Sequence, residues 1–148
     1  MNQELHEKYK DISLSPQLSQ MYAEIILSDP AVLQVFTYIA EATWESRESE
    51  IGVMFNDLVK SVKINRKVMH KKSKFQEVHT NIERRHAERI VDKFLMMGLC
   101  YYRTFGQPKA FYITKRGKQV MVSISQIKKG ADLTLDDQNN SHAEQPNS

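Results

Sequence analysis

The stretch from residue 80 to residue 114 constrains the fold most, because its hydrophobic period changes abruptly at a glycine. Apolar side chains recur over 81–97 at the three- and four-residue spacing of an amphipathic helix. After Gly98, two runs of β-branched and aromatic residues, 99–104 and 109–114, flank a turn that contains glycine and proline. The pattern predicts a helix that ends at Gly98 and a β-hairpin directly after it.

The two halves of this expected helix differ in chemistry. Thr80 and Glu83 have the T-x-x-E spacing of a capping box, which places the start of the helix near residue 81. The second half has an apolar face centred near Phe94, which suits a core, whereas the first half carries arginines. Arginine can donate two parallel hydrogen bonds to a phosphate or a guanine edge, and asparagine can pair with adenine through one donated and one accepted hydrogen bond. A helix N-terminus also favours negative charge. The candidate residues are Asn81, Arg84, Arg85 and Arg89. The alternative is a surface network in which Arg84 and Arg85 pair with Glu88, and Arg89 with Asp92.

The distribution of charge favours a polyanion as the partner of this helix. The net charge of the chain is only +3, but residues 60–118 hold sixteen basic and four acidic residues, a net +12. Residues 1–59 are acidic, with a net −7. Such an asymmetry indicates a binding face for nucleic acid, although a solvated basic surface remains the alternative.

Local signals predict further elements on both sides of this stretch. Ser15-Pro16 and Asp29-Pro30 each place a capping side chain before a proline, as at helix starts. Thr114 is placed to cap a last helix that ends at Gly130. The expected elements are helices over 16–27, 30–46, 55–62 and 114–129 and a very short strand within 51–54.

The segment 63–79 is an insert that is rich in lysine and arginine. The sequence does not decide between a short helix and a mobile loop. Its lysines would hold backbone phosphates outside the major groove, or else remain solvated without any contact. These lysines are Lys67, Lys71, Lys72 and Lys74.

The order of elements resembles the winged-helix DNA-binding fold, in particular MarR-type and related bacterial regulators. The resemblance rests on "FLMMGLCYYR" running into a hairpin and on "YITKRGKQVM", where Thr114 and Gly117 match the threonine and glycine that open the next helix. It covers roughly residues 30–127. The insert makes the connection before the recognition helix longer than the usual turn, and the hairpin lacks the D-x-R pattern of MarR-type proteins.

The resemblance implies a mainly α fold with a small β-hairpin wing, that is, a winged helix-turn-helix with extra N- and C-terminal helices. It places helix 81–97 in the major groove of double-stranded DNA and wing 99–114 on the flanking backbone. The groove-facing residues would be Asn81, Arg84, Arg85 and Arg89. The wing residues would be Arg103, Gln107 and Lys109.

The expected domain organisation is a flexible N-terminus over 1–14, one DNA-binding and dimerisation domain over 15–130, and a disordered tail over 131–148. No apolar run approaches the roughly 20 residues of a membrane helix, and the N-terminus lacks the features of a signal peptide. We therefore expect a cytoplasmic, nucleoid-associated protein that does not bind or cross a membrane. Cys100 is expected to be a buried packing residue rather than a reactive thiol.

Two function classes remain open. The first is a dimeric, sequence-specific DNA-binding protein, most simply a transcriptional regulator. The second is a winged-helix adaptor in plasmid or phage replication or partition, which binds DNA, a protein partner or both. We expect neither enzymatic activity nor a bound metal or cofactor, because no catalytic motif or metal-ligand spacing is present.

The first and last helices are expected either to form a homodimer or to complete the core of the monomer. Their apolar residues are Met21, Tyr22, Ile25, Ile26, Val120, Met121, Ile124 and Ile127.

Overall fold

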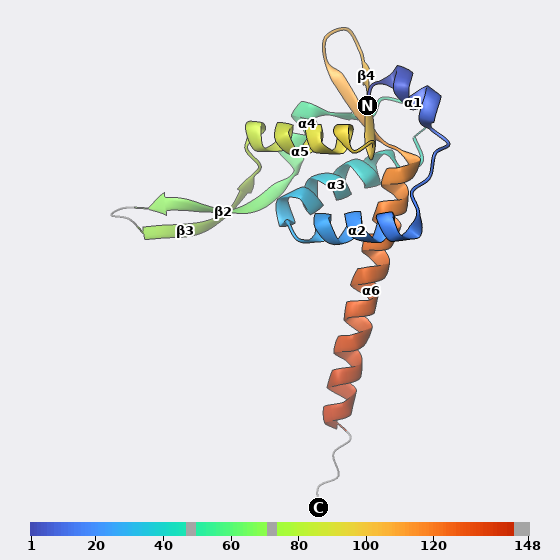
Figure 1. Ribbon diagram of the computed structural model, residues 1–148. Coiled ribbons are helices and arrows are strands. Elements are labelled where there is room, and N and C mark those ends of the chain that lie inside the picture. Colours follow the sequence, from blue (N-terminus) through green and yellow to red (C-terminus); the bar gives the residue numbers. More distant parts are fainter. Residues whose placement is uncertain (47–49, 71–73, 144–148) are drawn as a thin grey trace, which may run out of the picture.

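The computed structural model describes residues 1–46, 50–70 and 74–143, which form helices around small antiparallel sheets (Figure 1). The fold is mixed α/β, and helices predominate. The elements are α1 (Gln3–Tyr9), α2 (Pro16–Leu27), α3 (Pro30–Thr43), β1 (Val53–Met54), α4 (Phe55–Ser61), β2 (Lys63–His70), β3 (Lys74–Asn81), α5 (Arg84–Met96), β4 (Cys100–Thr104), β5 (Lys109–Ile113) and α6 (Lys115–Ala143).

Three of the expected helix starts are confirmed in atomic detail. The Ser15 side chain accepts a hydrogen bond from the Leu18 amide (3.2 Å) at the start of α2. Asp29 caps α3 in the same way, with Pro30 at the first helical position. Thr114 accepts from the Gly117 amide (3.1 Å) at the start of α6. These local signals were readable from the sequence because a capping side chain acts on its own helix.

A three-stranded antiparallel sheet joins distant parts of the chain. Its strand order is β1-β5-β4, with Val53 opposite Phe111 and Cys100 opposite Ile113. The predicted short strand and the predicted hairpin after Gly98 are therefore both confirmed. The sheet is tied to α3 by Thr43, whose hydroxyl accepts from the Ile113 amide (3.0 Å).

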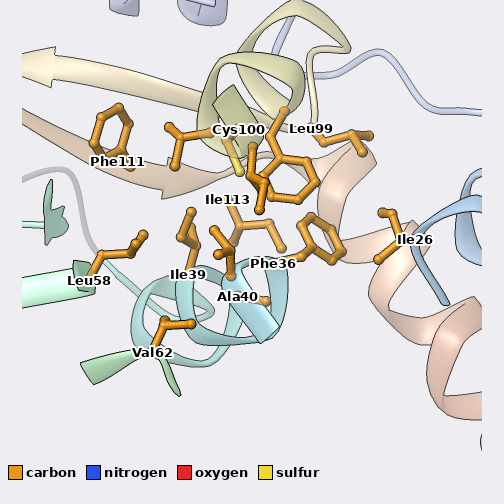
Figure 2. Packing of buried hydrophobic residues seen from close by; sticks show 14 of the residues in the cluster. Ile26, Phe36, Ile39, Ala40, Leu58, Val62, Leu99, Cys100, Phe111 and Ile113 are labelled. Atoms are coloured by element: carbon orange, nitrogen blue, oxygen red, sulfur yellow. The ribbon is translucent and has the colours of Figure 1, made fainter. Parts of the chain in front are cut away.

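The core lies between α3, α5 and the sheet. The rings of Phe36 on α3 and Phe94 on α5 are 4.9 Å apart. Leu58 of α4 belongs to the same buried cluster, in which Figure 2 labels Phe36 and Leu58. Cys100 is fully buried in this core, as expected, and burial raises the pKa of its thiol to about 12. The apolar face of α5 is thus used for packing, which leaves its opposite face to solvent.

The first residues are more ordered than the expected flexible N-terminus 1–14. They form α1, which is capped by Asn2, and the ring of His6 stacks on Tyr101 of β4 (3.6 Å). The Met1 carbonyl accepts from the Tyr102 amide (3.1 Å). Sequence patterns could not show this, because the segment is held by tertiary contacts and has no apolar period of its own.

The predicted end of the last helix at Gly130 is wrong. α6 continues to Ala143, so the described part of the expected disordered tail is helical, and Figure 1 shows this half of α6 projecting away from the rest of the chain. A glycine inside a helix costs only about 1 kcal/mol relative to alanine, and no proline follows before Pro146. A single glycine is therefore a weak stop signal.

The helices α2 and α6 pack against each other within one chain. The hydroxyls of Ser19 and Ser123 are 2.7 Å apart, and Ile26 and Ile124 are buried between the helices and the core. Completion of the core therefore accounts for part of their apolar surface. In contrast, Ile25 on α2 remains 52% exposed.

The described residues of the insert 63–79 form two strands and not a short helix or a loop. Residues 63–70 and 74–81 form a second antiparallel ladder, β2–β3, with Lys63 opposite Asn81 and His70 opposite Lys74. Figure 1 shows this hairpin projecting from the body at the end where α5 begins. Both expectations were wrong because both faces of the ribbon carry polar side chains, so alternation of apolar and polar residues is absent.

In the part of the chain that the structure describes, no single helix is long and apolar enough to cross a membrane. The helices α2 and α3 pass that test only as a pair, bent by 119° at the break between them.

Candidate nucleic-acid interface

The exposed face of α5 carries two arginines that have no partner among the described residues. Ala87, Ile90 and Phe94 are buried on one side of the helix, while Arg85 and Arg89, one turn apart, are exposed. No ion pair or hydrogen bond joins either guanidinium to another described residue. The alternative of a pairing network is therefore not formed at these two positions. Both side chains are free to donate paired hydrogen bonds to an external anion.

Arg84 is also exposed, but it is held in place by its neighbours. Its guanidinium donates to the side-chain oxygen of Asn56 on α4 (2.9 Å) and lies over the ring of Phe55 (4.9 Å). It also pairs with Glu88 at 3.7 Å, as the surface-network alternative predicted. Arg84 is thus preorganised on the flank of α5 that faces α4.

The predicted capping box and the predicted position of Asn81 are wrong. The helix begins at Arg84 with Glu83 as its N-cap, and no side chain caps it. Asn81 ends β3 opposite Lys63, so it does not lie on the face of α5. The T-x-x-E pattern failed because the backbone at Thr80 is already engaged in the β2–β3 ladder, which a local motif cannot reveal.

The β4–β5 hairpin carries three of the predicted residues near its turn. Gly106 adopts a positive φ of 69° there, and the Phe105 amide donates to the Pro108 carbonyl (2.9 Å). Gln107 and Lys109 are exposed, and the Lys109 ammonium lies over the ring of Tyr102 (4.3 Å). The Arg103 guanidinium lies 5.6 Å from the centre of the Phe105 ring. The hairpin thus carries two cationic side chains, Arg103 and Lys109, each of which packs against an aromatic ring.

A cleft of about 350 Å³ separates this hairpin from α5. It is lined by Arg84 and Glu88 of α5, by Asn56 of α4, and by Gln107 and Lys109 of the hairpin. The structure therefore places residues of α5 and of the β4–β5 hairpin around one cleft.

The insert residues fall into two groups. Lys67 and Lys74 are exposed on the β2–β3 hairpin, whereas Lys71 and Lys72 lie outside the described residues. The hairpin is fixed to the start of α5 by an ion pair between Arg66 and Glu83 (2.5 Å). Sequence reasoning missed this contact, since a separation of seventeen residues gives no local signal.

The described residues contain no group of three or more histidine, cysteine, aspartate or glutamate side chains placed to hold a metal ion. Comparisons of the chain with protein families, curated proteins and solved structures gave no match.

Proposed function

We propose that this chain is a winged-helix protein that binds double-stranded DNA in a sequence-specific manner, most simply as a transcriptional regulator. The order α3-β1-α4-α5-β4-β5 and the sheet order β1-β5-β4 support the fold assignment. In this proposal α5 lies in the major groove and the β4–β5 hairpin is a wing on the flanking backbone. The inserted β2–β3 hairpin is an addition to that plan.

The observation that carries the proposal is the pair Arg85 and Arg89. The two side chains are exposed, lie one helical turn apart, and have no acidic partner among the described residues. An arginine that is not neutralised by the protein gains most from an external anion, and its two parallel donors match a guanine edge or a phosphate. Arg84, Arg103 and Lys109 would supply contacts beside them.

The test is selection of duplexes from a randomised library by the full chain, followed by titration of the selected duplex at fixed salt. Arg85→Ala and Arg89→Ala should each weaken binding by about 1–3 kcal/mol, which is roughly 5- to 140-fold, because each removes a base or phosphate contact. Lys128→Ala on α6 is the control, since it removes an exposed positive charge far along another element. Failure to enrich any duplex would refute the proposal.

We further propose that the protein acts as a homodimer through α2. Leu18, Met21 and Ile25 lie at helical spacing on one face of α2 and are 42%, 44% and 52% exposed. Such a stripe is unfavourable in water and suits a second copy of the same stripe. Two copies of α5 could then address half-sites about one helical turn apart.

A second candidate function is that of a winged-helix adaptor, in replication or partition, that binds a protein partner. The observation that favours it is an apolar groove of about 460 Å³ between α1 and the end of α5. It is lined by Leu5, Tyr9, Ile12 and Met96, and Met96 is 88% exposed. If Arg85→Ala and Arg89→Ala left DNA affinity unchanged, this second function would be favoured.

A further inference from the structure

Two grooves flank the exposed arginines of α5, one on each side. The first is the cleft toward the β4–β5 hairpin, which Arg84 lines. The second, of about 630 Å³, lies between the β2–β3 hairpin and the start of α3, and His86 of α5 lines it together with Lys67 and His79 of the β2–β3 hairpin. Arg84 and His86 project from opposite flanks of the helix, so Arg85 and Arg89 lie on a ridge between the grooves.

The β2–β3 hairpin is basic and stands largely alone. Among its residues with described side chains, Lys63, Arg66, Lys67 and Lys74 outnumber the single acid, Glu77. In the described part of the chain, β2 and β3 pair only with each other. A two-stranded ribbon is marginally stable in water without a covering partner. Its charge disfavours pairing with the same ribbon of a second copy and favours a polyanion.

The hairpin is long enough to pass a DNA backbone. Eight residues per strand span about 26 Å. Half a turn of B-form DNA, which separates one groove from the next, is about 17 Å along the axis. A ribbon that leaves the start of α5 can therefore cross the adjacent backbone and reach the neighbouring minor groove.

Phe75 is an exposed apolar side chain on the outer part of the ribbon. Its side chain is 67% exposed, and its position lies one residue pair from the end of the ladder, where His70 pairs with Lys74. Because side chains alternate along a strand, Phe75 shares a face with Glu77 and with Lys67 opposite it. An exposed aromatic ring on a basic β-ribbon is the kind of side chain that contacts or partly unstacks base pairs in the minor groove.

The base of the hairpin is attached firmly to the start of α5. Besides the ion pair between Arg66 and Glu83, the Ile82 amide donates to the Val62 carbonyl (3.0 Å), and Ile64 and Ile82 are buried. The direction of the ribbon is therefore coupled to the position of α5.

We propose that the β2–β3 hairpin is a second wing, which holds the DNA backbone on the side of α5 opposite to β4–β5 and places Phe75 in the minor groove beyond it. This inference rests on the proposed function. In this arrangement α5 lies in the major groove, and each of the two DNA backbones that border the groove is contacted by a different hairpin of the same chain.

The test uses the full chain and the duplex that it selects, extended by mixed-sequence flanks to about three helical turns. The slope of log affinity against log salt is negative, and the double variant Lys67→Gln/Lys74→Gln should reduce its magnitude by about 1.8, since each lost phosphate contact contributes about 0.9. Lys128→Gln/Lys129→Gln removes the same charge from exposed positions on α6 and should leave the slope unchanged. Phe75→Ala should lose hydroxyl-radical protection of the minor groove on one flank only, with the protection around α5 retained.

The outcomes separate the two proposals. If the wild-type chain selects no duplex, the proposed function fails, and the second wing fails with it. If the wild-type chain binds its duplex but Lys67→Gln/Lys74→Gln keeps the wild-type slope, or Phe75→Ala keeps the wild-type footprint, only the second wing is overturned. All three substituted side chains are exposed, so the variants are expected to fold.

Discussion

At the scale of single residues, Arg116 shows how a charge count can mislead. It belongs to the basic stretch 60–118, yet it is only 6% exposed and contributes no cation to the surface. Its guanidinium donates to the carbonyls of Gly98 (3.0 Å), Tyr9 (2.8 Å) and Ile12 (2.9 Å). Burial lowers the pKa of the guanidinium. Arg116 therefore joins the N-terminal segment to the end of α5 and has no role at the candidate interface.

Arg116→Ala should reduce the free energy of unfolding by roughly 2–4 kcal/mol, because several carbonyls lose their donor in a poorly solvated site. Urea denaturation followed by the fluorescence of Trp44, the single tryptophan, measures this. Arg85→Ala is the matched control and should change stability by less than about 0.5 kcal/mol, since its side chain is exposed. Equal stability of the two variants would contradict the position of Arg116.

Among the elements, α6 contains two glycines at which substitution by alanine should change stability in opposite directions. A Cβ on Gly117 would collide with the Leu99 carbonyl and the Ile113 side chain, whereas a Cβ on Gly130 would meet nothing. Gly117→Ala should therefore destabilise the fold by about 1–3 kcal/mol through overpacking. Gly130→Ala should stabilise it by about 0.5–1 kcal/mol, as expected inside a helix. Thermal unfolding compares the two, and destabilisation by Gly130→Ala would show that α6 does not pass through residue 130.

The elements that could be predicted from sequence are those fixed by local chemistry. The helices after Ser15 and Asp29 and the hairpin after Gly98 follow from caps, prolines and apolar periods that act within a few residues. The β2–β3 ladder and α1 could not be predicted, because cross-strand pairing and contacts with β4 decide them. Arg85 and Arg89 were correctly predicted to be exposed, because the helical period within α5 decides which side they take. Asn81 was placed on the wrong element, because its pairing with Lys63 across the β2–β3 ladder has no local signal.

At the scale of the whole molecule, the proposed dimer predicts a concentration-dependent mass. Analytical ultracentrifugation at micromolar concentration should give twice the chain mass of 17.2 kDa. Ile25→Asp should shift the equilibrium to the monomer, because it places a charge in an apolar contact while its own site is half exposed in the chain. A wild-type monomer under these conditions would refute the dimer and leave α2 and α6 as parts of the monomer's core only.

We propose that Arg85 and Arg89, on the exposed ridge of α5, recognise the base sequence of a DNA duplex. The most direct measurement is the ratio of affinities for the selected duplex and for a mixed-sequence duplex, determined at one salt concentration for the wild-type chain and for Arg85→Ala/Arg89→Ala. We predict that the double substitution brings this ratio close to one while stability is unchanged, because base contacts carry sequence preference and phosphate contacts do not. A ratio that stays at the wild-type value would contradict the claim.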